Sequence, residues 1–345
     1  MKPLRAILIS IAAVALFAAA HVADPAAAPS PQSHDFVLVI HGGAGSYKGK
    51  SPEQSEAGVA AITHAAETGA AILKQGGRSL DAVEAALRIM EDSGAFDAGR
   101  GAYYSQAGVP ELDASIMDGK TLQAGAVASV RHIANPISLA RMVMERTKHV
   151  MIVGPGAEEF AQSQGVPLVP PFYFYTDREW KRYLNDKAKA EKKSSRLVNA
   201  PGVLDEPVHG TTGAVALDQA GNLAAGTTTG GTAFKMTGRV GDSPIIGAGT
   251  YANNQSCAVS GTGDGEFYIR NNVAADICAR VRYLHVPLEQ AANDVVMKEL
   301  VEQHGEGGVI ALDPQGHVAT PFNTNGMIHA IVRADGKIHI ETFKP

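Results

Sequence analysis

The sequence is poor in the residues and motifs that build metal sites and disulfide scaffolds. Its 345 residues include two cysteines and one tryptophan, and aromatic residues make up 6% of the chain. Two cysteines do not make a disulfide scaffold, although an exported protein could join Cys257 to Cys278. The chain has no CxxC or HExxH pair, which argues against a structural zinc site and against a zinc protease.

The signatures of the common serine hydrolases are also missing, and so is a basic surface. No serine stands in a G-x-S-x-G or S-x-x-K frame. The formal charge is −5, so the protein offers no general attraction for nucleic acid. One segment, 178–196, is rich in lysine and arginine, but no aromatic residues alternate with its lysines. We interpret this segment as a solvated helix or a flexible linker, not as a nucleic-acid or lipid patch.

The first residues are typical of an export signal. Lys2 and Arg5 precede an apolar run at 6–17 and a stretch of small residues at 18–20 that suits cleavage. The apolar run has roughly 15 residues, whereas a membrane-spanning helix needs about 20. We therefore predict a signal peptide at 1–20, a disordered leader at 21–35, and a periplasmic or secreted protein with no membrane attachment after signal removal.

The remaining chain alternates between strand-like and helix-like patterns. Strands are predicted at 36–40, 103–105, 114–117, 124–130, 149–154, 213–218, 223–229, 245–251, 257–260, 267–270, 309–312, 327–332 and 337–342. Helices are predicted at 53–75, 79–90 with Ser79 as N-cap, 135–146, 157–165, 273–283 and 288–304. Both halves mix strands with helix pairs, so we expect an α/β fold in which helices cover two stacked sheets, a four-layer α/β/β/α sandwich.

Four polar, glycine-rich stretches in the second half are candidates for a ligand site. They are HGTTG, TTTGG, GRVGDSP and SGTGDGE, and they begin at residues 209, 227, 238 and 260. Glycine lets the backbone approach a ligand and frees N–H groups to face it. Arg239 would grip a carboxylate through its fork of donors, and Asp242 would meet an ammonium group. Each stretch alone also fits an ordinary tight turn, but together they suit a small zwitterionic substrate.

A hydroxyl nucleophile needs a base, and no convincing histidine partner is visible in the sequence. A threonine at the N-terminus of a chain solves this problem, because its own α-amine acts as the base. Such a threonine requires the chain to be cut directly before it. The bond between Gly210 and Thr211 is a candidate, since it lies between an unpatterned charged segment and a buried strand.

Six stretches occur in order from about Phe36 to the C-terminus: VIHGGAG, ELDASIMDG, AGAVASV, HGTTGAVALD, GNLAAGTTTGGTAFKMTGRVGDSPIIGAGTYANN and ATPFNTNGM. They resemble the plant-type asparaginase and isoaspartyl peptidase family of N-terminal-nucleophile hydrolases. The resemblance implies an inactive precursor that cuts itself between Gly210 and Thr211. It implies an α subunit at 36–210, with a flexible linker at about 172–207, and a β subunit at 211–345. The two subunits would form one folded domain and dimerise into a heterotetramer.

The resemblance also implies roles for individual residues in the chemistry. Thr211 would attack first its own preceding carbonyl group and later the side-chain carbonyl of the substrate. Thr229 would hydrogen-bond the nucleophile and tune it. Thr262 and the Gly263 N–H would stabilise the oxyanion, an interaction whose loss typically costs about 100- to 1,000-fold in rate.

Further roles concern the substrate and an ion. By the same resemblance, Arg239 and Asp242 would hold the α-carboxylate and α-amine of the substrate, in agreement with the chemical argument above. The loop from Met90 to Arg100 corresponds to one that binds a structural sodium ion through backbone carbonyl groups. No other cofactor is expected.

Two positions depart from the family pattern. Thr212 replaces the usual valine after the nucleophile and brings a second hydroxyl group one residue away. The family reads FNAG where this chain has FDAG at 96–99, and an ionised Asp97 near an oxyanion would hinder it. Asp97 is either protonated, turned away, or the cause of an altered activity, so we do not include it in the predicted site.

The leading functional hypothesis is an amidohydrolase that releases aspartate from β-aspartyl dipeptides and, less efficiently, ammonia from asparagine. A second possibility is glycosylasparaginase activity, but the only tryptophan, Trp180, falls in the expected linker and provides no clear sugar platform. A third is a non-catalytic amino-acid-binding protein that has lost turnover through Asp97.

Overall fold

The computed structural model describes residues 34–45, 52–194 and 210–343. All of these lie in the unit that spans Ser33–Pro345. The predicted signal peptide, nearly all of the predicted leader and the segment 195–209 lie outside the described residues. No helix within the described ranges is long and apolar enough to cross a membrane.

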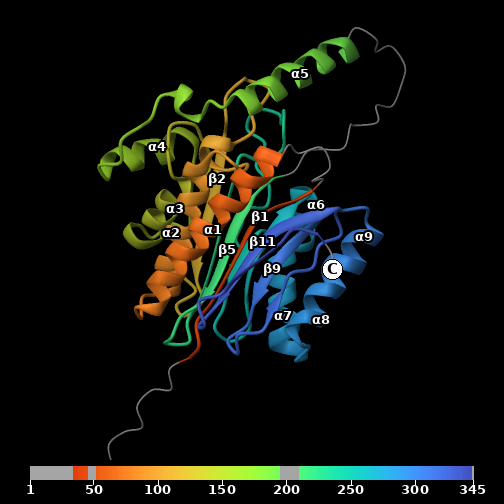
Figure 1. Cartoon of the computed structure of the whole chain (residues 1–345). Coiled ribbons are helices and arrows are strands. Elements are labelled where there is room, and N and C mark those ends of the chain that lie inside the picture. Colours follow the sequence, from red (N-terminus) through yellow and green to blue (C-terminus); the bar gives the residue numbers. More distant parts are fainter. Residues whose placement is uncertain (1–33, 46–51, 195–209, 344–345) are drawn as a thin grey trace, which may run out of the picture. The chain divides into compact units, whose positions relative to one another are not determined.

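An eight-stranded sheet forms one β layer (Figure 1), in the order β12-β11-β1-β5-β6-β2-β3-β4. All its neighbouring strands are antiparallel except β3 and β4. Its strands are β1 (Val37–Gly45), β2 (Leu112–Asp118), β3 (Ala124–Val130), β4 (Met151–Val153), β5 (Thr212–Leu217), β6 (Leu223–Thr229), β11 (Gly326–Arg333) and β12 (Ile338–Glu341). Strand β1 lies between β5 and β11, so segments before and after Thr211 share one sheet.

A four-stranded antiparallel sheet forms the second β layer, in the order β10-β9-β8-β7. Its strands are β7 (Thr250–Ala252), β8 (Ala258–Gly263), β9 (Gly307–Leu312) and β10 (Val318–Ala319). Side chains alternate between the two faces of each strand. Val39 and Val215 of the large sheet therefore share an apolar layer with Ile310 of the small sheet, whereas Leu38 and Ile40 pack on the helices of the opposite face.

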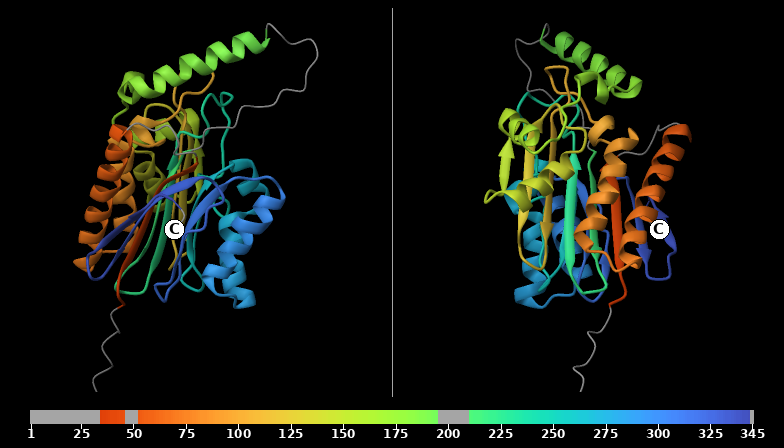
Figure 2. Two further views of the ribbon diagram at one scale, coloured as in Figure 1. Left: turned by 45° about the vertical axis from the view of Figure 1, so that its right-hand side comes forward. Right: turned by 90° about the vertical axis from the view of Figure 1, so that its left-hand side faces the viewer.

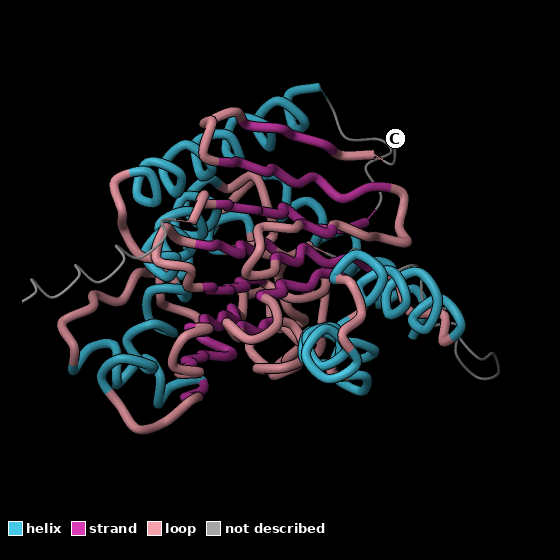
Figure 3. The backbone as a smooth tube through the Cα atoms, turned by 90° about the horizontal axis from the view of Figure 1, so that it is seen from below, coloured by secondary structure: helices cyan, strands magenta, loops and turns pink. Residues whose placement is uncertain are grey.

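Helices cover the outer face of each sheet (Figure 2). On the large sheet these are α1 (Pro52–Lys74), α2 (Ser79–Ser93), α3 (Pro136–Arg146) and α4 (Gly154–Ser163). On the small sheet they are α6 (Gly265–Asn271), α7 (Val273–Leu284), α8 (Leu288–Asn293), the π-helical segment η3 (Asp294–Glu299) and α9 (Leu300–Glu302). Figure 3 shows the strands side by side with helices around them. The predicted four-layer α/β/β/α sandwich is confirmed.

The predicted strand at 267–270 is wrong, because these residues belong to helix α6. The ring of Tyr268 is fully buried, and its hydroxyl group donates a hydrogen bond to the Gly308 carbonyl at 2.9 Å. The predicted strands at 103–105 and 245–251 are also largely wrong. The first contains a single bridge, and only the last two residues of the second belong to β7.

Residues 171–174 and 177–194 are helical, so the expected flexible linker is wrong for this part of the chain. The 3₁₀ segment η2 (Pro171–Phe174) precedes α5 (Asp177–Ser194), so the helical alternative holds for this part. Glu179 of α5 is buried and pairs with Arg178 and Arg182. Trp180, which we expected in a linker, packs edge-on against Tyr104 with ring centroids 5.4 Å apart. The first turns of α5 are therefore fixed to the body of the protein.

The two cysteines form the disulfide bond that we considered possible. Cys257 directly precedes β8 and Cys278 lies on α7. The bond therefore joins the small sheet to its covering helices, and both cysteines lie after Thr211 in the chain.

Candidate active site

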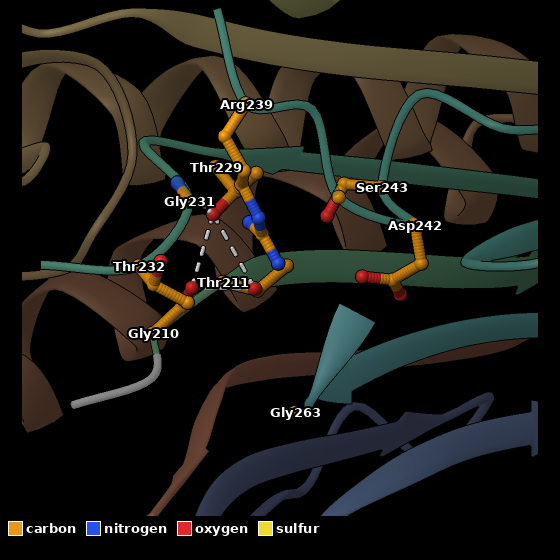
Figure 4. Close-up of a pocket in the computed structure, with 10 residues that line it drawn as sticks. Gly210, Thr211, Thr229, Gly231, Thr232, Arg239, Asp242, Ser243 and Gly263 are labelled. Carbon is orange, nitrogen blue, oxygen red and sulfur yellow. Dashed lines mark hydrogen bonds between the residues drawn. The ribbon is translucent and has the colours of Figure 1, made fainter. Parts of the chain in front are cut away.

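A pocket lies where β5 begins and β6 ends. The antiparallel register pairs Thr212 with Thr228, which places Thr211 beside Thr229 on neighbouring strands. Ten residues line the pocket (Figure 4): Gly210, Thr211, Thr229, Gly231, Thr232, Arg239, Gly241, Asp242, Ser243 and Gly263. Six of the seven predicted site residues are among them.

The seventh predicted residue, Thr262, does not line the pocket. Its side chain is fully buried, and its Oγ1 atom accepts a hydrogen bond from the Ala44 N–H at 3.1 Å. This contact uses Thr262 Oγ1 as an acceptor and does not use its hydroxyl proton. Gly263, the next residue, does reach the pocket and ends strand β8.

The carbonyl group of Gly210 lies between two threonine hydroxyl groups. Thr211 Oγ1 is 2.5 Å from the Gly210 carbonyl oxygen. Thr229 Oγ1 donates a hydrogen bond to the same oxygen at 3.0 Å and lies 3.4 Å from Thr211 Oγ1. A donor that polarises a carbonyl group beside a potential nucleophile favours attack on that group. The bond that we predicted to be cut is therefore the one on which these groups converge.

Asp97 belongs to this cluster, although the predicted site did not include it. Its Oδ2 atom lies 3.2 Å from Thr229 Oγ1, and its Oδ1 atom accepts a hydrogen bond from the Tyr103 N–H at 2.8 Å. Burial is the main cause that raises the pKa of Asp97 to about 8. Glu179 acts in the same direction, whereas hydrogen bonds from the Tyr103 N–H and from Thr229 and the charge of Lys235 oppose the shift. The neutral form of the carboxyl group therefore predominates at pH 7, and it can act as a hydrogen-bond donor, as the family asparagine can.

Thr212, the other departure from the family pattern, is directed away from the pocket. Successive side chains of a strand point to opposite faces of the sheet. The Thr212 hydroxyl group is fully buried and donates a hydrogen bond to the Thr228 carbonyl at 3.4 Å. Its hydroxyl group is not a second candidate nucleophile in this arrangement.

The loop after β6 carries both predicted substrate-binding residues into the pocket. Lys235 anchors this loop through a 2.7 Å hydrogen bond from its ammonium group to the Glu111 carbonyl. Arg239 donates two hydrogen bonds to Glu266, from Nε at 3.0 Å and from Nη2 at 2.9 Å. Asp242 is buried, and a Cβ atom at Gly249 would lie 2.7 Å from its Oδ2 atom. The pocket thus offers one cationic and one anionic side chain beside Thr211.

The loop from Met90 to Arg100, for which a structural sodium ion was predicted, is tightly packed around two glycines. The carbonyl oxygens of Glu91 and Phe96 lie so close to Gly99 and Gly101 that a Cβ atom at either glycine would clash with them. Hard cations prefer such oxygen ligands. The loop thus offers carbonyl oxygens of the kind that a sodium ion would need, and the ion itself stays a prediction. In the described part of the chain, no group of three or more His, Cys, Asp or Glu side chains forms a metal site.

Several residues of the site escaped the sequence analysis. Thr232 and Ser243 line the pocket, and both lie inside or beside the glycine-rich stretches that drew attention. Glu266 also lies in one of these stretches, but nothing in the sequence indicated that it contacts Arg239. The signal for Asp97 was its departure from an otherwise matching motif.

The layers and Thr211, directly before β5, define an α/β sandwich hydrolase of the N-terminal-nucleophile type. Comparison with known proteins agrees with this class. The family model described as asparaginase matches residues 34–342, and the chain belongs to this family.

The alignments with known relatives cover most of this chain and nearly all of each relative. The isoaspartyl peptidase of Salmonella typhimurium is 48% identical over 85% of this chain and 94% of its own length. The isoaspartyl peptidase of Escherichia coli is 47% identical, over 85% and 92%. The isoaspartyl peptidase/L-asparaginase of Danio rerio is 42% identical, over 89% and 95%.

Proposed function

We propose that the protein is a self-activating amidohydrolase that releases L-aspartate from β-aspartyl (isoaspartyl) dipeptides and from L-asparagine. One observation carries the proposal: the Gly210 carbonyl group is held between the hydroxyl groups of Thr211 and Thr229, next to Arg239 and Asp242. The names of the relatives support the same substrates.

Maturation begins with the attack of Thr211 Oγ1 on the carbonyl carbon of Gly210. The peptide C–N bond breaks as the ester bond forms, and the nitrogen of Thr211 takes up the proton of its hydroxyl group. Thr229 stabilises the negative charge that develops on the Gly210 oxygen. Water then hydrolyses the ester, so that Gly210 ends in a carboxylate and Thr211 gains a free α-amine.

Turnover uses the same hydroxyl group with the new amine as its base. Arg239 and Asp242 hold the α-carboxylate and α-ammonium groups of the aspartyl half, and the Gly263 N–H receives the oxyanion. The matching role of Thr262 stays a prediction, because its side chain does not line the pocket. Thr211 Oγ1 attacks the side-chain carbonyl carbon, the amide C–N bond breaks, and the departing amine takes the proton. Water releases aspartate from the acyl-enzyme.

The remaining expectations complete the proposal. Signal removal at 1–20 and export would deliver a protein that matures into segments 21–210 and 211–345. Two such pairs would form a heterotetramer, and a sodium ion would hold the loop from Met90 to Arg100. No membrane or nucleic-acid partner is proposed.

A side-by-side product assay tests the proposal. The purified protein would receive a β-aspartyl dipeptide, asparagine and glycosylasparagine, and released aspartate would be measured for each. We expect the dipeptide to be the best substrate, because none of the described residues that line the pocket has an aromatic side chain to stack on a sugar. Comparable or faster sugar-asparagine hydrolysis would make the protein a glycosylasparaginase, and binding without turnover of any substrate would make it a binding protein.

A further inference from the structure

The guanidinium group of Arg239 is bound by Glu266, a residue that has no role in the mechanism above. Glu266 lies in the first turn of α6, and its two oxygens accept hydrogen bonds from Nε and Nη2 of Arg239 at 3.0 and 2.9 Å. Its side chain is 62% exposed, whereas that of Arg239 is 17% exposed. Glu266 does not line the pocket.

The donors of a guanidinium group allow two carboxylates to bind at once. Arginine has five N–H donors in a fixed planar fork, and Glu266 takes the edge formed by Nε and one N–H of Nη2. The edge formed by Nη1 and the second N–H of Nη2 is left. Among the described residues, Nη1 of Arg239 has no hydrogen-bond partner, and this edge matches a carboxylate with two parallel hydrogen bonds.

The backbone at the start of α6 lies close to Arg239 and Asp242. A Cβ atom at Gly265 would lie 2.9 Å from Nη2 of Arg239 and equally close to Oδ1 of Asp242. The start of α6 therefore passes beside both substrate-binding side chains, and Gly265 permits the approach. Arg239 and Asp242 extend into the same pocket as Thr211 (Figure 4).

We infer that Glu266 is a positioning residue for substrate: it fixes Arg239 through one edge of the guanidinium group so that the opposite edge meets the α-carboxylate of the aspartyl half. This inference rests on the proposed function. An arginine without this support would have to give up rotamer freedom each time substrate binds, at a cost in affinity. The α-carboxylate does not react, so its contacts are the same in the bound substrate and in the transition state. Glu266 therefore affects KM and leaves kcat nearly unchanged.

The test compares Glu266→Gln with the wild-type protein on a β-aspartyl dipeptide. The amide keeps the size of the side chain but replaces one acceptor by a donor that faces the guanidinium group. We expect KM to rise about tenfold, kcat to change less than twofold, and self-cleavage to proceed at the wild-type rate, because the precursor bond carries no α-carboxylate. Calorimetric titration with L-aspartate should show the same tenfold loss of affinity.

Two comparisons separate positioning from general damage. Glu299→Gln breaks a similar carboxylate–arginine pair, with Arg280 at 2.7–2.8 Å, away from the pocket, and should leave KM unchanged. With a substrate whose α-carboxylate is converted to a carboxamide, Glu266→Gln and wild type should differ less than twofold. Arg239→Lys, which keeps the charge but loses the fork, should raise KM for the normal substrate more than Glu266→Gln does.

Three results would overturn the inference: an unchanged KM in Glu266→Gln, a lower KM, or an equal loss with the carboxamide substrate. A lower KM would mean that Glu266 competes with the substrate for Arg239. A wild-type protein that neither cleaves itself nor releases aspartate would refute the proposed function itself, and the inference with it. Normal wild-type activity combined with an unaffected Glu266→Gln variant would refute the inference alone.

Discussion

Thr211 has two tasks in the proposed function, and both depend on one hydroxyl group. In the uncut chain this group already lies 2.5 Å from the Gly210 carbonyl oxygen. The same hydroxyl group can attack a substrate carbonyl only after the cut has freed the α-amine that serves as its base. A substitution at this residue therefore acts on maturation first and on turnover second.

We expect Thr211→Ala to stay whole and inactive, because the attacking atom is missing while strand β5 still packs. Thr211→Ser keeps the hydroxyl group but loses the methyl group that restricts χ1, so its hydroxyl group spends less time in the attack geometry. It should cleave slowly and show weak activity. A time-resolved gel and an aspartate-release assay measure both effects. Complete cleavage of Thr211→Ala would refute the N-terminal-nucleophile mechanism.

Asp97 illustrates how a neutral acid can replace an amide. Thr229 Oγ1 has one proton, and the Gly210 carbonyl needs it. A charged Asp97 would compete for that proton, whereas a neutral Asp97 can donate its own to Thr229 Oγ1, as an asparagine amide would. With burial raising the pKa of Asp97 to about 8, the neutral form predominates at pH 7.

Asp97→Asn should accordingly mature and turn over substrate at pH 7 within about threefold of the wild-type rates. Asp97→Leu removes the donor to Thr229 and should slow self-cleavage by about 10- to 100-fold, less than the roughly 100- to 1,000-fold loss of a direct oxyanion donor, because Asp97 acts through Thr229. Cleavage half-times after cell-free synthesis measure both. An Asp97→Asn variant more than tenfold faster than wild type would mean that Asp97 is charged in the native protein.

At the scale of elements, the sequence predicted contacts between residues that are near one another in the chain and missed contacts between residues that are far apart in it. Thr229, Arg239 and Asp242 lie on one strand end and the loop that follows it, so a single stretch of sequence indicated that they act together. Asp97 contacts Thr229 only because the loop after α2 packs on the end of β6, and no local pattern reports such a contact. Its chemical role could not be predicted without knowing its burial.

The strand predicted at 267–270 failed for a related reason. Phe267 and Tyr268 favour strands by intrinsic preference, but that preference depends strongly on context. Tyr268 here fills the core beneath α6 and bonds to Gly308 on β9. The predicted N-cap of α2, Ser79, is also wrong because of a contact distant in sequence. Arg78 occupies that position, and the N–H of Ser79 is bound by Asp218, a residue 139 positions away.

A chain of buried polar side chains joins the two sheets beneath the site. His41 Nε2 on β1 lies 3.1 Å from Ser260 Oγ on β8, and Ser260 Oγ lies 2.7 Å from Thr227 Oγ1 on β6. Thr250 on β7 bonds to Thr227 and to Ser115 on β2. Because buried polar groups are costly without partners, these hydrogen bonds fix how β6, which carries Thr229, faces β8, which carries Gly263.

His41, one of these buried polar side chains, also makes the stability of the protein sensitive to acid. Burial and the neighbouring His329 lower the pKa of His41 to about 3, while the backbone of Thr211 opposes this shift. The unfolded chain binds a proton at His41 below about pH 6.5, but the folded protein does not until about pH 3. The free energy of unfolding should therefore fall as the pH is lowered across this range, by up to about 1.4 kcal/mol per pH unit from His41 alone.

Urea unfolding of the uncut Thr211→Ala chain between pH 4 and pH 7.5 measures this dependence, with His41→Asn in the same background for comparison. The asparagine variant should be less stable at pH 7, since it loses part of the contact with Ser260, but its stability should fall less steeply toward low pH. Parallel curves for the two proteins would show that His41 does not stay neutral in the folded state.

At the scale of the whole molecule, the cut proposed after Gly210 does not separate two independent bodies. Strand β1 from the first segment pairs with β5 on one side and with β11 on the other, over five and seven residue pairs. Helices α1 and α2, also from the first segment, pack on that same sheet. Each segment alone would leave a large apolar face without cover.

Purified protein should therefore show two bands on a denaturing gel and one species on gel filtration. No covalent bond joins the two fragments, because the disulfide bond between Cys257 and Cys278 lies wholly within the second fragment. The shared sheet should nevertheless keep them together. N-terminal sequencing of that fragment should read Thr-Thr-Gly-Ala, beginning at Thr211. The Thr211→Ala protein, run in parallel, should give one band at the full length. A fragment beginning at Thr212 would show that Thr211 is not the nucleophile. Separation of the fragments under native conditions would contradict the shared sheet as the structure that holds the mature enzyme together.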